Sequence, residues 1–387
     1  MAQALTIFRP PDRHGTADTP LPAAPLRHVM HVLPGFGVGG IQVRLARIIN
    51  ALGPRFRHTV LSLNGDISCR ERIDPAAAVT VEQAAPHGNL LVRLAANANR
   101  IHATTPDLLA TYNWGAIEWA MANRLRVGAR HCHFEDGFGP DEAERPLWRR
   151  GVLRRVALAR TEAVIVPSHS LETIALRRWR LPESRVLYLP NGIEVGDFRQ
   201  SAIGALPFPR GDNEIVIGTV APLRPEKNLG RLLNAFARLD NRATRLVIAG
   251  DGSERPMLEA MARRLGIADR VCFLGAVREP QRVLAFFDVF ALSSDTEQMP
   301  MTVLEAMAAG LPIAAVEVGD VKHMVAPANR AFVVPRGETT LATALAALVA
   351  DTGRRHALGR INRAHVTAVF PFARMVEAYA RLFEGTA

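Results

Sequence analysis

The chain of 387 residues contains little cysteine and no long apolar run. Its three cysteines, Cys69, Cys132 and Cys272, are scattered and odd in number. This pattern argues against a disulfide framework or a zinc-ligand spacing and favours a reducing, cytoplasmic location. No transmembrane helix is predicted, because no run of about 18 apolar residues occurs. Residues 1–25 lack the apolar segment of a secretory signal, and their polar, proline-containing composition predicts a disordered leader.

Negative charge is also scarce relative to positive charge. The formal net charge is +10 and the isoelectric point is about 10.7. Such an excess suits a nucleic acid, an anionic membrane surface or a phosphate-rich substrate. Aromatic and basic residues are not interleaved and no nucleic-acid-binding module is recognisable, so we expect no nucleic-acid partner.

The most informative stretch of the sequence spans residues 293–312. An apolar run at residues 289–292 precedes it and predicts a buried parallel strand. A polar loop follows, and then a helix that begins near Pro300 and stops at Gly310 and Pro312. Ligands of open α/β sheets bind at the carboxyl ends of strands, and the free N–H groups near Met301 and Thr302 favour oxyanions and hydroxyl oxygens.

Two acidic residues mark the same stretch. Glu297 lies on the predicted loop and Glu305 lies in the predicted helix, so the two side chains can contact different parts of one long ligand. Carboxylates at such a place suit the hydroxyl groups of a sugar, which donate hydrogen bonds to them. The alternative interpretation is that both are solvated surface acids.

The pattern Glu297-x7-Glu305 followed by Ala-Met-Ala-Ala-Gly-Leu-Pro resembles the GT4 family of retaining glycosyltransferases. The resemblance covers about residues 28 to 385. It implies the GT-B fold, an α/β architecture in which two Rossmann-like, doubly wound parallel-sheet domains face a cleft. It also implies sugar transfer from a nucleotide-sugar substrate to an acceptor hydroxyl, with no cofactor and no metal. By the resemblance, Glu297 holds the donor sugar and Glu305 the ribose hydroxyls.

A glycine-rich segment, residues 35–40, follows the first predicted strand and opens a helix at residues 41–52. Read literally it is the dinucleotide-binding fingerprint G-x-G-x-x-G. That fingerprint also requires an acid at the end of the second strand, but the strand at residues 58–63 ends in Asn64 and Gly65. The resemblance implies instead that Gly39 and Gly40 let the backbone approach the phosphates and sugar of the donor.

Titratable side chains are dense in residues 130–140, at the end of another predicted strand. His131 and His133 would share one face of that strand, but two histidines without a placed third ligand are weak evidence for a metal. The absence of any Asp-x-Asp motif also argues against a metal-dependent transferase. GT4 proteins have a histidine close to the reacting sugar here, and either His133 or Asp136 occupies its position.

The second half contains two loops that the resemblance assigns to the donor. Lys227 matches the family lysine that neutralises the diphosphate, a role that suits a fixed ammonium group. The family arginine falls on Pro222, and Arg224 is the candidate replacement. The turn containing Gly250 and Gly252 lies beside the nucleotide in GT4 proteins.

The predicted domain organisation follows these motifs. An acceptor-side Rossmann-like domain spans residues 26–197, a linker 198–212, and a nucleotide-sugar domain 213–365. A helix at residues 366–387 is expected to pack back on the first domain.

The helix predicted at residues 141–160 carries six arginines and an aromatic edge. It is therefore a candidate for peripheral contact with an anionic membrane, with a solvated arginine face as the alternative.

The function predicted from all of this is a retaining, hexosyltransferase-type glycosyltransferase. We expect it to act in cell-surface polysaccharide or glycolipid assembly, with a glycan or a lipid-linked acceptor. Two alternatives stay open: a non-catalytic subunit that binds a sugar nucleotide, and a nicotinamide-dependent oxidoreductase.

Overall fold

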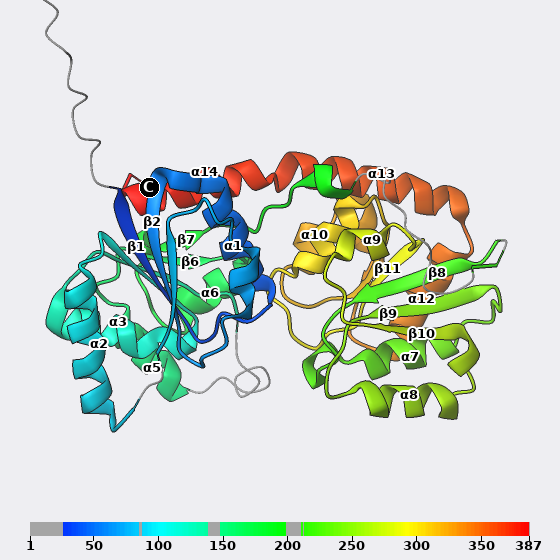
Figure 1. The fold of residues 1–387 in the computed structure, drawn as a ribbon. Helices are drawn as coiled ribbons and strands as arrows, with labels where there is room; N and C mark the ends of the chain where they lie inside the picture. The colour runs from blue at the N-terminus through cyan, green and yellow to red at the C-terminus, as the bar shows by residue number, and fades with distance from the viewer. Residues whose placement is uncertain (1–25, 85–86, 138–147, 199–209, 212, 387) are drawn as a thin grey trace, which may run out of the picture.

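The computed structural model describes residues 26–84, 87–137, 148–198, 210–211 and 213–386 (Figure 1). The predicted leader lies outside the described residues. So do residues 138–147, where the predicted basic helix begins, and most of the predicted linker.

The first domain is built on a parallel sheet whose described strands run in the order β3-β2-β1-β4-β5-β6-β7. The strands are β1 (Arg27–Leu33), β2 (Phe56–Ser62), β3 (Val79–Gln83), β4 (Leu108–Tyr112), β5 (His131–Phe134), β6 (Ala163–Val166) and β7 (Val186–Tyr188). The helices are α1 (Gly40–Leu52), α2 (Leu90–Thr104), α3 (Ile117–Ala122), α5 (Trp148–Ala157) and α6 (His169–Arg177). Every residue of β4 and β5 is buried, as expected of strands that are covered on both faces.

The second domain repeats this plan with the strand order β10-β9-β8-β11-β12-β13, again parallel. Its strands are β8 (Ile215–Val220), β9 (Thr244–Ala249), β10 (Val271–Gly275), β11 (Val289–Leu292), β12 (Ile313–Val316) and β13 (Val333–Val334). Its helices are α7 (Leu229–Ala237), α8 (Arg255–Arg264), α9 (Pro280–Leu284), α10 (Met301–Ala308), α11 (Val321–Met324), α12 (Glu338–Val349) and α13 (Thr352–Val369). The predicted fold of two doubly wound parallel-sheet domains is confirmed.

Each sheet has one point where the strand order reverses, between β1 and β4 in the first and between β8 and β11 in the second. Loops that leave adjacent strands there diverge to opposite faces of the sheet, so a crevice forms between them. The loops that follow β1, β4 and β5 meet the loops that follow β8 and β11 across one cavity. The two crevices therefore face each other.

The chain crosses between the domains at two places that lie side by side. Ile193, in the first crossing, donates its backbone N–H to Phe370 and accepts from Phe372. Gly192 packs so closely here that a Cβ on it would lie 3.0 Å from the Cα of Phe372. Beyond the second crossing, α14 (Phe372–Glu384) buries Tyr379 and its other apolar residues in the core of the first domain (Figure 1).

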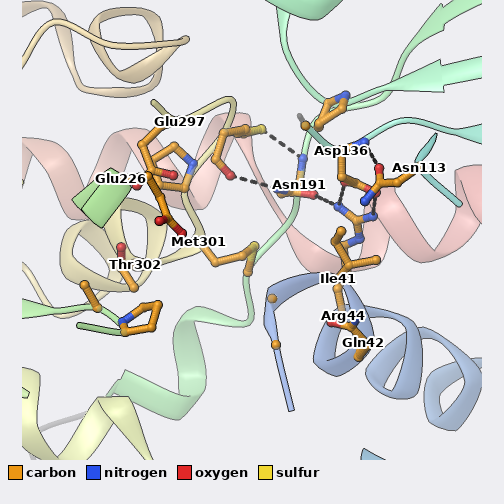
Figure 2. A pocket seen from close by; sticks show the side chains of 18 of the residues that line it. Ile41, Gln42, Arg44, Asn113, Asp136, Asn191, Glu226, Glu297, Met301 and Thr302 are labelled. Atoms are coloured by element: carbon orange, nitrogen blue, oxygen red, sulfur yellow. Dashed lines mark hydrogen bonds and ion pairs between the residues drawn. The ribbon is translucent and has the colours of Figure 1, made fainter. Parts of the chain in front are cut away.

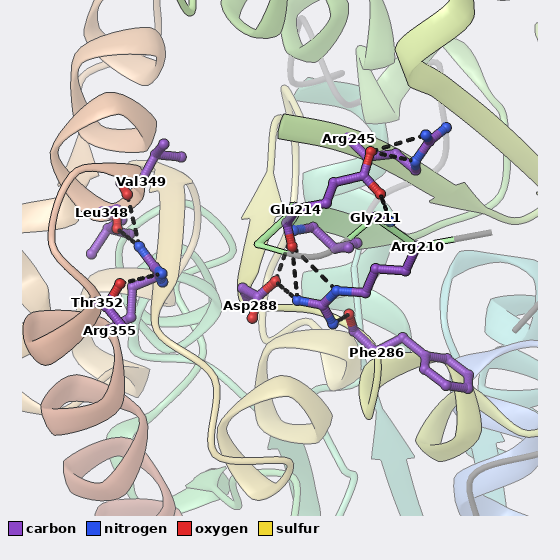
Figure 3. A network of polar contacts seen from close by, with 11 residues as sticks. Arg210, Gly211, Glu214, Arg245, Phe286, Asp288, Leu348, Val349, Thr352 and Arg355 are labelled. Carbon is purple, nitrogen blue, oxygen red and sulfur yellow. Dashed lines mark hydrogen bonds and ion pairs between the residues drawn. The ribbon is translucent and has the colours of Figure 1, made fainter. Parts of the chain in front are cut away.

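The second domain begins at a polar cluster around Arg210 (Figure 3). The Arg210 guanidinium donates to the backbone oxygens of Glu214 and Phe286 and pairs with Asp288 at 2.5 Å. The Asp288 carboxylate also accepts from the backbone N–H of Val216. These bonds join the start of β8 to the segment before β11, so Arg210 fixes the chain at the edge of the domain.

A second arginine in Figure 3, Arg355, caps the carboxyl end of α12. Arg355 donates to the backbone oxygens of Leu348 and Val349, both at 2.8 Å, at the carboxyl end of α12. A cation at that end satisfies free carbonyl groups and opposes the helix dipole.

One arginine of helix α5 is buried, although the sequence predicts an exposed arginine face for this helix. Arg154 is fully buried, and its Nε donates to the buried carboxylate of Glu135 at 3.0 Å. Its guanidinium lies 4.9 Å from the ring centroid of Trp114 and 4.8 Å from that of Trp179. Arg154 is therefore buried because it faces the Glu135 carboxylate and two indole rings. The sequence pattern of the helix does not indicate this.

Buried histidines occupy the core of the first domain. His31 Nε2 lies 2.9 Å from His58 Nδ1, and both His131 and His133 lie 2.8 Å from the hydroxyl of Thr111. Burial lowers the pKa of His58 to about 4 and that of His131 to about 3, and it holds the pKa of His31 well below its usual value. The imidazoles of His31, His58 and His131 are therefore neutral in the folded protein at physiological pH.

We predict that the free energy of unfolding falls steeply between pH 7 and pH 5. Below about pH 6.5, His58 and His131 bind protons in the unfolded chain but not in the folded protein, where they are buried. Their contribution to the free energy of unfolding is therefore fully present above that pH and is lost as pH falls. Each histidine contributes a loss of about 2 kcal/mol at pH 5. Denaturant titration at both pH values measures this. His58→Gln should flatten the dependence, whereas His102→Gln at an exposed position should not; equal behaviour of the two variants would refute the assignment.

Candidate functional site

A cavity of about 780 Å³ lies between the two domains and is lined by both. Its walls come mainly from the loops at the carboxyl ends of the strands and from the first turns of α1 and α10. The charged and amide side chains that line it are Gln42, Arg44, Asn113, Asp136, Arg150, Asn191, Arg224, Glu226, Lys227 and Glu297. Charged and amide side chains therefore gather at the place where open α/β sheets bind ligands.

An ion pair dominates the wall from the second domain. Lys227 Nζ lies 2.5 Å from Glu297 Oε1, and the hydroxyl of Ser294 donates to the same oxygen at 2.8 Å. The two side chains are only 19% and 11% exposed. At that burial, the ammonium and carboxylate groups hold each other in place at the cavity wall.

The loops that carry this pair are tied together by further polar contacts. Asn228, with a left-handed φ of 41°, begins α7 and donates its side-chain amide to Asp295. Arg231 pairs with the same carboxylate at 2.6 Å. The backbone N–H of Asp295 also donates to the backbone oxygen of Glu226. The geometry of Lys227 and Glu297 is therefore set by a connected network rather than by two independent loops.

The wall from the first domain has its own buried pair. Arg44 on α1 makes two bonds to the Asp136 carboxylate, at 2.6 and 2.7 Å, and both side chains are nearly fully buried. Burial by itself would lower the pKa of Arg44, but the Asp136 carboxylate raises it above its usual value. The backbone N–H of Asp136 donates to the side chain of Asn113 at 2.7 Å. Asp136 is thus fixed as a charged acceptor at the end of β5.

Asn191 joins the two walls (Figure 2). Its side-chain oxygen accepts from Arg44, and its side-chain amide donates to the backbone oxygen of Met299 at 3.0 Å. Met299 directly precedes the start of α10, so the two domains are connected by hydrogen bonds inside the site itself.

The two candidates for the catalytic position on β5 are placed differently. Asp136 lines the cavity. His133 does not: it is fully buried in the sheet, bonded to Thr111, with its Nε2 at 3.5 Å from Glu135. Successive residues of a strand point to opposite faces, and every residue of β5 is buried, so both faces of this strand are covered by protein. His133 is therefore enclosed. The structure thus brings Asp136 and Glu297 to the cavity and leaves His133 in the core.

The glycines predicted to bind the donor fall into two groups. Gly39 and Gly40 line the cavity at the start of α1. Gly250 and Gly252 do not line it; a Cβ at Gly250 would lie 1.8 Å from the backbone oxygen of Ala221. The second pair has φ values of 149° and 159° and supports the loop that leads to Arg224.

The remaining predicted donor residues lie on or next to α10. Met301 and Thr302 line the cavity at its first turn, and Arg224 lines it from the loop after β8. Glu305 is one turn further along α10 from Met301 and is not part of the lining. Burial raises the pKa of Glu305 to about 7, although the Arg47 guanidinium opposes this shift.

Comparison with known proteins identifies the two halves of the chain. Residues 38–197 match the family model described as Glycosyltransferase Family 4, and residues 207–365 match the model described as Glycosyl transferases group 1. The chain belongs to the GT4 family of glycosyltransferases. The alternative of a nicotinamide-dependent oxidoreductase is not favoured, and neither is that of a non-catalytic subunit.

Individual relatives agree with this family. The chain is 27% identical over 313 residues to a putative glycosyltransferase, EpsF, of Bacillus subtilis, covering 74% of this chain and 78% of that one. It is 27% identical over 360 residues to the 2-deoxystreptamine N-acetyl-D-glucosaminyltransferase of Streptomyces fradiae, covering 82% and 84%. Among solved structures, HepE of Anabaena in complex with UDP-glucose superposes with a TM-score of 0.76 at 18% identity, covering 92% and 99%. The GT-B fold is thereby confirmed.

Some lining residues of this glycosyltransferase were not predicted from its sequence, notably Arg44 and Asn191, whereas Asn113 belongs to a Tyr-Asn-Trp segment whose position after a strand suggests either a sugar contact or ordinary packing. One signal was available for Arg44. It lies on the apolar face of α1, three positions after Ile41 and four before Ile48, where an arginine must find a buried partner. Asn191 gave no comparable signal for the site, because its partners come from other segments of the chain.

We predict that Glu305→Gln stabilises the ligand-free glycosyltransferase at alkaline pH. Because the folded pKa of Glu305 is raised from 4.5 to about 7, its ionisation destabilises the folded state as pH rises through this range. Glutamine removes that cost, so the free energy of unfolding should increase by about 3 kcal/mol at pH 8.5 and by less than about 1 kcal/mol at pH 5. Denaturant titrations measure the gain. The exposed control Glu377→Gln should show none, and a pH-independent effect of Glu305→Gln would contradict the prediction.

Proposed function

We propose that this glycosyltransferase moves a sugar from a nucleoside diphosphate sugar, held mainly by the second domain, to an acceptor hydroxyl that approaches along the first domain. The anomeric bond to the diphosphate breaks and a bond to the acceptor oxygen forms, with retention of configuration. The observation that carries this proposal is the pairing of Lys227 with Glu297 on the cavity wall, beside the amino end of α10. HepE, of the same fold, was solved with UDP-glucose.

The proposed donor roles follow from charge and position. Lys227 and Arg224 are the cations at the end of β8, and they suit the negative charge that develops on a leaving diphosphate. The free N–H groups of Met301 and Thr302 at the start of α10 suit oxyanions in the same region. Glu297 is placed to accept hydrogen bonds from sugar hydroxyls while it orients Lys227. Glu305 is proposed to accept from the ribose hydroxyls.

We assign Asp136 a binding role at the reacting sugar rather than that of a general base. Both of its carboxylate oxygens accept from Arg44, so the geometry of the carboxylate is fixed. A charged acceptor of fixed position suits a hydroxyl group of the transferred sugar. His133, which is buried behind it, is proposed to support the strand end through Thr111 and not to touch the substrate.

The acceptor is proposed to be a glycan or a lipid-linked glycan, consistent with a cytoplasmic enzyme working at the inner face of a membrane. No helix in the described part of the chain is long and apolar enough to span a bilayer. Helix α5 nevertheless exposes four apolar side chains: Trp148 (73% exposed), Val152 (52%), Leu153 (40%) and Val156 (44%). Arg149 and Arg155 are exposed on the same helix. This combination suits the interface of an anionic membrane.

Loss of the donor contacts should abolish transfer without unfolding the protein. Lys227→Ala and Glu305→Gln should each lower kcat/KM by about 100-fold or more, because each removes a group that is proposed to bind the donor. The substrate is chosen by screening nucleotide sugars for thermal stabilisation. The control Lys322→Ala removes an exposed lysine of the same domain and should keep full activity. Wild-type rates in both site variants would refute the site assignment.

Charge reversal on α5 should weaken membrane binding. Arg149→Glu combined with Arg155→Glu should lower the binding constant for phosphatidylglycerol vesicles, measured by co-sedimentation, by about 30-fold or more, because each arginine near an anionic surface contributes about 1 kcal/mol. The matched control is Arg263→Glu with Arg264→Glu, two exposed arginines of α8, which changes the net charge equally. The proposed orientation is contradicted if both double variants lose binding to the same extent, or if neither loses it.

A further inference from the structure

Asp320 is a buried carboxylate at the interface between the two domains. It is 3% exposed and lies in the second domain, between β12 and α11. Its partners are in the first domain, at the amino end of α6. The backbone N–H of His169 donates to its Oδ2 at 2.6 Å, and Ser170 donates to its Oδ1 from both the backbone N–H and the hydroxyl, at 3.0 and 2.7 Å.

The contact completes a helix cap with a residue from the other domain. Ser168 caps α6 locally by accepting from the backbone N–H of Leu171. The N–H groups of His169 and Ser170 have no acceptor of that kind within α6, and the Asp320 carboxylate accepts from both. An anion at a helix amino end is also favoured by the helix dipole.

A buried carboxylate is costly unless it is paired and hydrogen-bonded. Glu135, which is also fully buried, has the guanidinium of Arg154 as its partner. Asp320 has no lysine or arginine within ion-pair distance among the described residues, so the donors at the start of α6 are what compensate its charge. Separation of the domains would exchange these donors and the positive helix end for water, so the charge-assisted bonds of Asp320 favour the arrangement in which the domains are in contact.

The same segment supports the loop that carries Glu297. The backbone N–H of Asp320 donates to the backbone oxygen of Gln298 at 2.9 Å. A Cβ on Gly319 would lie 2.3 Å from the backbone oxygen of Glu297. The side chain of Gln298 also accepts from Ser168 at 3.1 Å, next to the α6 cap. One connected interface is thus formed by residues 297–298, residues 319–320 and the start of α6.

From these contacts we infer that Asp320 is a positioning residue. Its hydrogen bonds with His169 and Ser170, which we call the latch, hold the second domain against the amino end of α6. The latch thereby fixes the Glu297 loop relative to the wall that carries Asp136. The latch is distinct from the chain crossings, because its atoms belong to neither of them. Its consequence for sugar transfer rests on the proposed function, whereas its consequence for domain closure does not.

Single-molecule energy transfer between the domains tests the latch in the full-length chain without nucleotide. Dyes are placed on exposed positions of α2 and α8, through His102→Cys and Arg263→Cys, with Cys272→Ser to avoid labelling elsewhere. In the latched protein we expect one narrow distance distribution. Asp320→Asn, which places amide hydrogens against the donors of α6, should shift it to longer distances or broaden it. Ser170→Ala, which removes one donor only, should act in the same direction with a smaller effect.

The matched control is Asp351→Asn. Asp351 caps the amino end of α13 within the second domain, accepting from the backbone N–H of Arg354. Its substitution therefore removes an aspartate cap of the same kind without crossing the interface. It should leave the distance distribution unchanged, whatever it does to the melting temperature. A distribution that is identical in wild type, Asp320→Asn and Ser170→Ala would overturn the inference, and so would an equal shift in Asp351→Asn.

Kinetics then separate positioning from simple destabilisation. At a temperature where Asp320→Asn is fully folded, we expect kcat to fall about tenfold while KM for the nucleotide sugar changes less than threefold, because the donor is held mainly by the second domain. If wild-type protein transfers no sugar at all, the proposed function fails while the distance measurement still decides the latch.

Discussion

The side-by-side crossing of the chain at Ile193 and Phe370 is the constraint on which the rest of the structure depends. Two parallel-sheet domains joined by one linker could adopt many relative orientations. Here the two connections are hydrogen-bonded to each other, and the close contact of Gly192 with Phe372 leaves little room between them. Since α14 then packs into the first core, the first domain contains chain from before the first crossing and after the second, and the second domain is the segment between them. The facing strand ends, and hence the cavity, follow from this arrangement.

Within the cavity, most of the charged side chains meet a partner from the protein. Arg44 is paired with Asp136 and Lys227 with Glu297. Such pairing is needed because the walls are largely buried, and an unpaired ion there would be costly. It also keeps each group close to one geometry before a ligand arrives, which is how a site stabilises developing charge without reorganisation. Glu305, which lies one turn further along α10 and outside the lining, differs: burial raises its pKa to about 7.

In the interior of the first domain the buried polar side chains are also paired, but they are uncharged. Its core contains histidines bonded to threonine, tyrosine and each other rather than ionised. Their burial keeps them neutral and leaves the ionised groups to the strand ends. The exposed apolar residues of α5 are the contrasting case, and they form the surface for which we propose membrane contact.

The sequence by itself determined the fold and the centre of the site. Apolar runs and glycine-rich turns predicted the strands and helices, and the Glu297-x7-Glu305 pattern led to the family. Lys227, Glu297 and Asp136 were found because local motifs place them at strand ends. The sequence did not decide between His133 and Asp136 for the position beside the cavity, because the loop that follows β5 aligns in two ways.

Only the tertiary structure decided which side chains meet. Arg44 with Asp136, Asn191 with Met299, and Asp320 with the start of α6 are each more than 90 residues apart in sequence. Gly250 and Gly252 lie in the predicted turn, yet they pack under the loop before Arg224 rather than on the cavity wall. A motif fixes local geometry, because neighbouring residues share one backbone path. Contacts across the cleft depend on how two domains close, and no local pattern encodes that.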